Sequence, residues 1–133
     1  MSGDFIDSNV ILYLLDSGPK ANRAEAVLAQ GGVISVQVLN EVLVNCVRKA
    51  GMSFEEAGDF LAGVRQLCRV TDLTVEVHDV GRAVALRYGL SVYDAMIVGA
   101  ALVAGCDGIL SEDMQDGLVI EGVLTVSNPF REG

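Results

Sequence analysis

Four acidic residues from separate parts of the chain stand in stretches that are otherwise apolar. They are Asp7, Glu41, Asp94 and Asp113. Carboxylates that lie close together repel one another and resist burial unless a cation neutralises them. Oxygen donors of this kind suit Mg²⁺ and Mn²⁺, and a divalent ion held by them can activate water for a hydrolytic reaction. The sequence therefore predicts an acidic metal pocket, provided that the fold brings these residues together.

Each acid also has a structural interpretation that involves no metal. Asp94 follows a serine at the spacing of a helix capping box, and Asp7 can cap a helix that begins just after it. Glu41 can lie on a solvated helix face. Asp113 and Asp116 stand in a loop, where acids commonly form turns. No single acid decides between these interpretations, but the joint placement favours the pocket.

The elements that must position these residues follow from hydrophobic periodicity and from helix start and stop signals. Short β-compatible stretches predict strands at Asp4–Asp7, Val33–Ser35, Val70–Leu73, Gly108–Ser111 and Val123–Val126. Helices are predicted at Ala21–Gln30 after Pro19, and at Val36–Lys49, Ser53–Leu67, Val75–Tyr88 and Ser91–Gly105. Alternating strands and helices imply a three-layer α/β/α domain with a central parallel sheet of about five short strands, formed by residues 1–133 as one unit.

This topology gives the acids a place to converge, because ligands of open parallel sheets gather at the carboxyl ends of the strands. Asp7 lies at the end of the first predicted strand, and Asp113 lies just past the end of another. Glu41 stands in the helix that follows the second strand. Asp94 stands in the first turn of a helix that is apolar almost all round. Such a helix is normally buried, so its aspartate needs a partner.

Composition and charge limit the classes of protein. The net charge of −9 at pH 7 is the wrong sign for a protein that holds nucleic acid by its overall field. An apolar content of 51% and a mean hydropathy of +0.44 exclude a disordered chain and favour a surface covered by a partner. The longest nearly uncharged run, Ala95–Cys106, is too short to span a bilayer, and the first residues carry no basic lead. We therefore expect a cytoplasmic protein without membrane association. Cys46, Cys68 and Cys106 lack the spacing of a zinc site and are expected to be reduced core thiols.

The motifs around the acids resemble those of a PIN domain, and closely those of the VapC-type toxin nuclease of a VapBC toxin–antitoxin pair. Four motifs occur in the order of that family: Phe5-Ile6-Asp7-Ser8-Asn9, Asn40-Glu41-Val42, Gly89-Leu90-Ser91-Val92-Tyr93-Asp94-Ala95 and Leu110-Ser111-Glu112-Asp113. The resemblance implies that Mg²⁺ or Mn²⁺ is bound by the catalytic acids Asp7, Glu41, Asp94 and Asp113. It also implies secondary polar roles near the pocket for Asn9, Ser111 and Asp116.

Further expectations follow from the same resemblance. The substrate would be RNA, hydrolysed to products with 5′-phosphate and 3′-hydroxyl ends. The partners would be a VapB-type antitoxin and a second copy of the chain, with the helices Ala21–Gln30 and Val36–Lys49 as the antitoxin surface. Because the net charge is negative, local cations must hold the phosphates, and the candidates are Arg48, Lys49, Arg65, Arg69, Arg82 and Arg87.

Two other functions stay open at this point. An aspartate after the first strand also serves aspartyl phosphatases, but these need a second aspartate where this chain has Asn9. They also need a lysine near the late strands, whereas the only lysines are Lys20 and Lys49. The other alternative is a PIN-like fold that acts only as a protein-interaction module. Metal-free cleavage through the RNA 2′-hydroxyl usually needs a separate general acid and general base, most often histidines. Because His78 is the single histidine, the sequence favours the metal-dependent mechanism.

Overall fold

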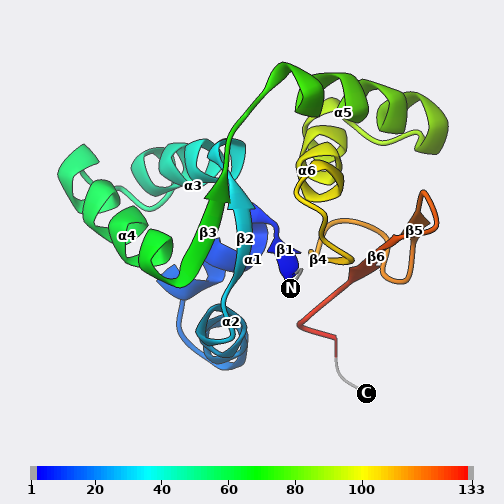
Figure 1. Cartoon of the computed structure of the whole chain (residues 1–133). Helices are drawn as coiled ribbons and strands as arrows, with labels where there is room; N and C mark the ends of the chain where they lie inside the picture. The colour runs from blue at the N-terminus through cyan, green and yellow to red at the C-terminus, as the bar shows by residue number, and fades with distance from the viewer. Residues whose placement is uncertain (1–2, 132–133) are drawn as a thin grey trace.

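A computed structural model describes residues 3–131 of the chain, in which a six-stranded sheet carries helices on both faces (Figure 1). The strands are β1 Asp4–Ile6, β2 Gly32–Ser35, β3 Cys68–Thr71, β4 Gly108–Leu110, β5 Val119–Ile120 and β6 Leu124–Ser127. They lie in the order β3-β2-β1-β4-β6-β5. The pairs from β3 to β6 are parallel, and β5 is antiparallel to β6.

The predicted central parallel sheet of about five short strands is confirmed, and a further strand, β5, joins its edge in the antiparallel direction. β5 is the missed strand, because two residues are too few to show an alternating pattern. The strand predicted at Val70–Leu73 begins earlier, at Cys68, which pairs with Gly32 on β2 as soon as the preceding helix ends. These differences lie at the edges of the sheet and leave its centre as expected.

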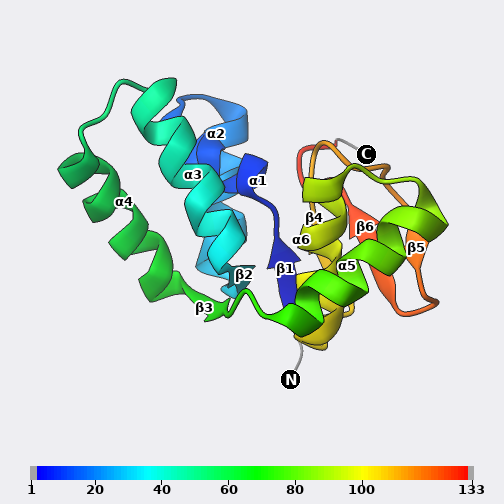
Figure 2. The ribbon, with the colours of Figure 1, turned by 90° about the horizontal axis from the view of Figure 1, so that it is seen from above.

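The helices are α1 Ser8–Leu12, α2 Pro19–Ala29, α3 Val36–Arg48, α4 Phe54–Leu67, α5 Val75–Tyr88 and α6 Val92–Val103, with a 3₁₀ turn, η1, at Tyr13–Leu15. Figure 2 shows α1, α2, α3 and α4 grouped to one side of β1, and α5 with α6 to the other. The predicted capping box at Ser53 and Glu56 is present at the start of α4. No helix within residues 3–131 is long and apolar enough to cross a membrane.

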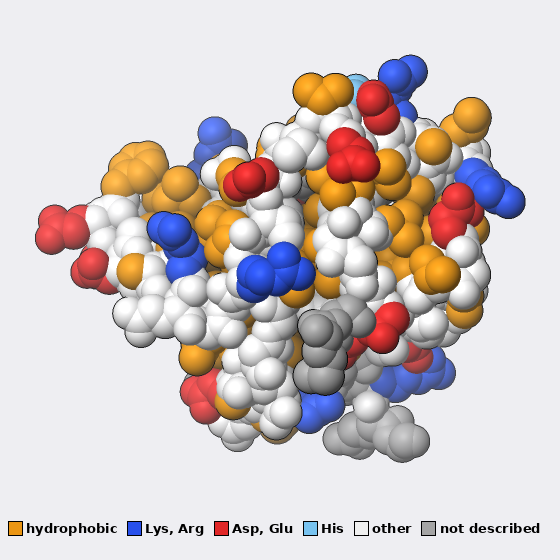
Figure 3. Space-filling model, in the orientation of Figure 1, with side chains coloured by type: hydrophobic (Ala, Val, Ile, Leu, Met, Phe, Trp, Pro, Cys, Tyr) orange, Lys and Arg blue, Asp and Glu red, His pale blue; other side chains and the backbone are white. Residues whose placement is uncertain are grey.

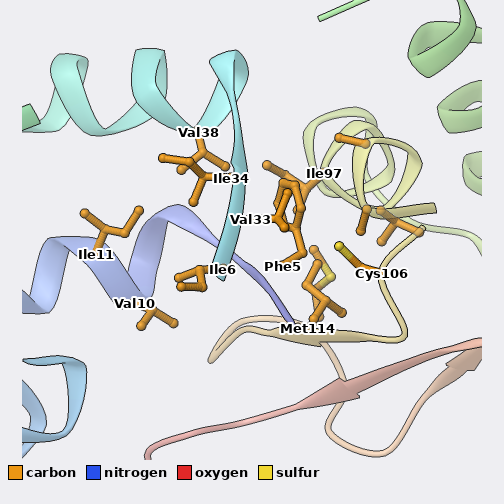
Figure 4. Close-up of a cluster of buried hydrophobic side chains, with 14 of the residues drawn as sticks. Phe5, Ile6, Val10, Ile11, Val33, Ile34, Val38, Ile97, Cys106 and Met114 are labelled. Carbon is orange, nitrogen blue, oxygen red and sulfur yellow. The ribbon is translucent and has the colours of Figure 1, made fainter. Parts of the chain in front are cut away.

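Side chains of the central strands alternate between the two helical layers (Figure 4). Phe5 and Val33, which are register partners on β1 and β2, point towards Ile97 on α6. Ile6 and Ile34, the next residue on each strand, point towards α1 and α3. All of these side chains are buried. The carboxyl end of β1 is therefore fixed from both faces of the sheet.

A close approach of two glycines fixes α6 against α5. A Cβ atom added at Gly99 would lie 2.9 Å from the Gly81 nitrogen and 2.9 Å from the Val77 carbonyl oxygen. Only glycine allows the two helices to approach this closely. The contact sets the position of α6 and thus of Asp94, which lies in its first turn.

Candidate active site

Asp7 directly follows β1 and is the N-cap residue of α1. The residue is buried, with 4% of its surface exposed. Its Oδ1 accepts a hydrogen bond from the Ser8 backbone N–H at 2.7 Å. Its Oδ2 accepts one from the Ser111 hydroxyl at 2.8 Å and one from the Asn9 amide at 3.2 Å. Both carboxylate oxygens are thus held by the segments that follow β1 and β4.

Glu41 reaches the same place from α3. The Ser8 hydroxyl donates to Glu41 Oε1 at 2.9 Å and lies 3.4 Å from Asp7 Oδ1, so one hydroxyl bridges the two carboxylates. Glu41 Oε2 accepts a hydrogen bond from the Gln37 amide at 3.0 Å, and the same amide donates to the Tyr93 carbonyl oxygen at 3.2 Å. Gln37 therefore ties Glu41 to the start of α6.

Asp94 approaches from the start of α6, where it is half-buried. Its backbone N–H donates to the Ser91 hydroxyl oxygen at 3.3 Å, so the expected capping contact is present. Its carboxylate raises the pKa of Asp7 by charge repulsion, as does that of Glu41. Ser91 thus caps α6, and the carboxylate of Asp94 lies within electrostatic reach of the two bridged acids.

Burial is the main cause of an unusual pKa at Asp7. Loss of solvation raises the pKa from 3.8 to about 6, although the hydrogen bonds from Ser111 and Ser8 lower it. In the described part of the chain, no lysine or arginine forms an ion pair with Asp7, Glu41 or Asp94. An ionised carboxylate that is buried beside two others is unfavourable, and a bound cation would relieve the repulsion.

The loop after β4 supplies the polar residues expected from the late motif. The Ser111 hydroxyl oxygen, which is buried, accepts hydrogen bonds from the backbone N–H groups of Asp113 and Met114, at 3.3 Å each. Asn9 Oδ1 accepts one from the Glu112 N–H at 3.2 Å. The Asp113 carboxylate is exposed and has no hydrogen-bond or ion-pair partner within residues 3–131. The structure therefore groups Asp7 with two of the other predicted acids and leaves Asp113 at the rim.

Asp116, expected as a further acid near the pocket, instead holds the segment that follows β6. Its Oδ1 accepts a hydrogen bond from the Asn128 backbone N–H at 2.9 Å, and its Oδ2 pairs with Arg131 at 2.7 Å. The hydrogen bond from Asn128 is the main reason why the pKa of Asp116 lies below its usual value, and the contact with Arg131 adds to it. These contacts explain the acid without a role in the pocket.

A second polar cluster beside the acids was not predicted. The Tyr13 hydroxyl donates to Glu112 Oε1 at 2.6 Å, and the Lys20 ammonium donates to Glu112 Oε2 at 2.6 Å. The ammonium also lies 5.0 Å from the centre of the Tyr13 ring and 5.8 Å from that of Phe130. This Tyr13–Lys20–Glu112 cluster holds the loop after β4 against η1 and α2. Its members are too far apart in the sequence for spacing to reveal them.

Of the remaining unpredicted contacts, one could have been inferred from sequence spacing and another could not. Gln37 stands one helical turn before Glu41, so the i, i+4 spacing on a predicted helix is a signal that identifies it. Ser8 lies within the first motif, but its bridge to Glu41 depends on how α1 meets α3. Spacing along the chain does not carry that information.

The donor set fits an oxygen-preferring divalent ion in charge and in ligand type. Mg²⁺ usually binds through one or two carboxylates and keeps several waters. Asp7 and Glu41, bridged by Ser8, supply such a pair, with Asp94 within electrostatic reach. Among the described residues, no three His, Cys, Asp or Glu side chains are arranged as a complete metal-binding group. The protein thus offers carboxylates that suit the ion without a fully assembled coordination shell.

Basic side chains are interspersed with acidic ones on the face shown in Figure 3, and they do not form one patch there. Lys20, Arg87 and Arg131 are engaged in ion pairs with glutamate or aspartate. Lys49 is placed differently, because it lies with Asn9 and Asp113 along a cleft of about 610 Å³ beside the acids. Among the candidate phosphate-binding cations, it is therefore the one with a structural link to the site.

Comparisons with known proteins identify the family and the fold. A sequence model of the PIN domain matches residues 5–115. No curated protein matches significantly in sequence. A toxin–antitoxin complex from Klebsiella pneumoniae is similar in structure, with a TM-score of 0.73 and 17% identity over 95% of this chain and 97% of that chain. DNA-bound VapBC from Salmonella typhimurium gives a TM-score of 0.72 and 19% identity over 97% of this chain and 99% of that chain. A sarcin–ricin loop cleaving toxin from Mycobacterium tuberculosis gives a TM-score of 0.64 and 19% identity over 79% of this chain and 85% of that chain.

Proposed function

The chain belongs to the PIN domain family, and from this premise we propose that it is a Mg²⁺- or Mn²⁺-dependent endoribonuclease and the toxin of a type II toxin–antitoxin pair. The observation that carries the proposal is the buried Asp7 carboxylate, which Ser8 bridges to Glu41 and which lies within electrostatic reach of Asp94. A buried carboxylate lies there beside two others, and no described cationic side chain is paired with any of them. Such a group suits a divalent ion, and divalent ions support phosphodiester hydrolysis. A similar fold in a sarcin–ricin loop cleaving toxin supports the same activity.

The acids have separate tasks in this proposal. Asp7, Glu41 and Asp94 hold the ion, and Asp113 either binds it from the rim or positions water. When bound, the ion would lower the pKa of water and stabilise the charge that develops on the scissile phosphate. The carboxylate oxygens carry the negative charge that retains the ion, so the loss of one carboxylate should weaken binding of the ion. Because the acids act as a unit, the effects of single substitutions should not be additive.

The neutral side chains around the acids fix their geometry. The Ser111 hydroxyl and the Asn9 amide hold one oxygen of Asp7, at 2.8 Å and 3.2 Å. The Ser8 hydroxyl restrains Glu41 at 2.9 Å. These groups carry no charge, so they orient the carboxylates without competing with a cation for them.

Cleavage of total cellular RNA by the purified, partner-free protein tests the proposal. We expect cuts at a limited set of sites in Mg²⁺ or Mn²⁺ and none in EDTA. Asp7→Asn, Glu41→Gln and Asp94→Asn should each remove nearly all cleavage, whereas Asp59→Asn, at an exposed carboxylate on α4, should retain it. Cleavage that persists in EDTA, or that survives Asp94→Asn unchanged, contradicts the metal-dependent mechanism. No cleavage in either metal would favour a protein-interaction module.

We further propose that an antitoxin protein covers α2 and α3. Complexes of toxins with antitoxins are among the similar structures, and Val44 on α3 leaves 49% of its surface exposed. Titration calorimetry with the protein encoded next to this chain should show tight binding, and Val44→Asp should weaken it. Unchanged affinity in that variant would rule out the α3 surface.

A homodimer is the second proposed assembly. Large apolar side chains are exposed on α5 and α6, with Leu86 at 89%, Val75 at 77% and Tyr93 at 71% exposure. Apolar surface of this kind gains stability when a second copy covers it. Light scattering at micromolar concentration should therefore give the mass of a dimer. A monomer under these conditions would exclude the dimer and leave the nuclease proposal standing.

A further inference from the structure

The cleft of about 610 Å³ beside the acids lies between η1 and the end of α3, and its size is that of a small-molecule site. Asn9, whose amide binds Asp7, and Asp113 line it on the side of the acids. Asn45, Lys49 and Ala50 line it from α3 and the turn after α3. The cleft is therefore continuous with the proposed reaction site through Asn9 and Asp113.

Lys49 supplies an ammonium group to a cleft that Asp16, Glu112 and Asp113 also line. It is the one lysine or arginine among the described residues of the lining, and it forms no ion pair within residues 3–131. Asp16 and Asp113 line the same cleft without pairing with it. An ammonium group that is exposed at such a position can bind a phosphate of a bound polyanion.

The wall formed by η1 contains the ring of Tyr13, which its contacts hold in place. The Tyr13 hydroxyl is held by Glu112 at 2.6 Å, and the ring meets Phe130 edge-on with centroids 4.7 Å apart. The apolar side chains of Leu12 and Leu15 adjoin it in the lining. Asn45 donates its amide to the Glu41 carbonyl oxygen at 2.8 Å, which leaves its Oδ1 as an acceptor. A flat apolar wall, a hydrogen-bond acceptor and a cation together suit a nucleotide, which has a base with N–H groups and a phosphate.

We propose that this cleft, termed the Lys49 cleft, seats a nucleotide of the RNA substrate next to the scissile phosphate. Lys49 contacts the phosphate of that nucleotide, and the base lies against Tyr13 within reach of Asn45. The inference rests on the proposed ribonuclease function and adds a substrate-binding site that selects where the RNA is cut. Because Asn9 and Asp113 line the cleft, an RNA with its scissile phosphate at the acids can extend into it.

The phosphate contact is tested by binding rather than by cleavage. Anisotropy titrations of a labelled single-stranded RNA of mixed sequence in EDTA give the affinity at several salt concentrations. Each phosphate contact on a single strand contributes about 0.7 to the slope of log K against log salt. Lys49→Ala should lower the slope by about 0.7, whereas Arg131→Ala, at an arginine already paired with Asp116, should leave it unchanged. A wild-type slope in Lys49→Ala, or no RNA binding by the wild type, overturns the proposal.

The base contact is tested by filling the cleft. Ala50 is exposed in the lining, so Ala50→Trp should occupy the cleft without unfolding the protein, and Ala62→Trp at an exposed position on α4 is the matched control. We expect Ala50→Trp to reduce RNA affinity at least tenfold and to change the map of cleavage sites, while Ala62→Trp does neither. RNA affinity and a cleavage map that match the wild type would overturn the proposal, and loss of antitoxin binding in the same variant would assign the cleft to the antitoxin. Failure of the wild type to cleave RNA at all would instead refute the proposed function, and the binding data would still decide on the cleft.

Discussion

The stability of the metal-free protein should rise as the pH falls from 7 to 5, because Asp7 binds a proton more readily in the folded chain than in the unfolded chain. Burial raises its pKa from 3.8 to about 6. Between these two values the folded state binds more protons, so the free energy of unfolding increases as the pH decreases. The full shift corresponds to about 3 kcal/mol, of which about 1.4 kcal/mol is gained between pH 7 and pH 5.

Groups with the opposite shift act at lower pH. The hydrogen bond from Lys20 is the main reason why the pKa of Glu112 lies below its usual value. The hydrogen bond from the Ser53 backbone has the same effect on the pKa of Glu56. Their stabilising contributions are present above the unfolded pKa and are lost only as the pH falls through the lower, folded pKa. The interval from pH 7 to pH 5 therefore isolates the effect of Asp7.

Urea denaturation in EDTA at pH 7, 6 and 5 measures this change in the free energy of unfolding. In thermal denaturation the same change corresponds to a rise of about 5 °C in melting temperature for a chain of this size. Asp7→Asn should abolish the rise, and Asp59→Asn, at an exposed carboxylate, should retain it. Saturating Mg²⁺ should stabilise the protein at pH 7 and flatten the dependence, because the ion favours the ionised carboxylates. A wild-type stability that is constant or decreases from pH 7 to pH 5 would refute the reasoning.

Three further outcomes are expected. Mg²⁺ should raise the melting temperature of the wild type, and Asp94→Asn should blunt that rise while stabilising the metal-free protein by relieving repulsion; a wild type insensitive to metal in thermal denaturation would count against the pocket. His78→Ala should cleave RNA at a rate within a few-fold of the wild type, because this exposed residue on α5 is remote from the acids, and a large loss would point to a proton relay. Glu112→Gln should lower both the melting temperature and the cleavage rate, because it releases the loop after β4. Glu121→Gln loses a similar pair of contacts, to Arg87 and a tyrosine, and should leave the cleavage rate unchanged. Equal cleavage rates in the two variants would contradict a positioning role for Glu112.

The elements that position the site were predictable because their signals are local. The helix at Val36–Arg48 has apolar residues at helical spacing, and Ser53 and Glu56 form the capping box that their spacing indicates. The strand at Val119–Ile120 was missed, because two residues form a strand only when β6 lies beside them. That strand forms because it pairs with β6, and its two residues contain no pattern that predicts it.

The candidate site divides in the same way. Asp7 and Asp94 stand next to element boundaries that the sequence shows, so the expectation that they lie at one edge of the sheet came from the topology. The hydroxyl bridge from Ser8 to Glu41 and the pairing of Lys20 with Glu112 join segments that are distant in the sequence. Such contacts depend on distances that only the packed structure determines.

The chemical ends of the RNA products test the proposed mechanism most directly. Purified protein is incubated with a structured RNA in Mg²⁺, and the ends of the fragments are identified by mass spectrometry. Attack by water on the phosphodiester bond predicts fragments with a 5′-phosphate and a 3′-hydroxyl, formed only when the divalent ion is present. Fragments that end in a 2′,3′-cyclic phosphate would show that the 2′-hydroxyl attacked, and this result would contradict a hydrolysis carried out by Asp7, Glu41 and Asp94 with a metal ion.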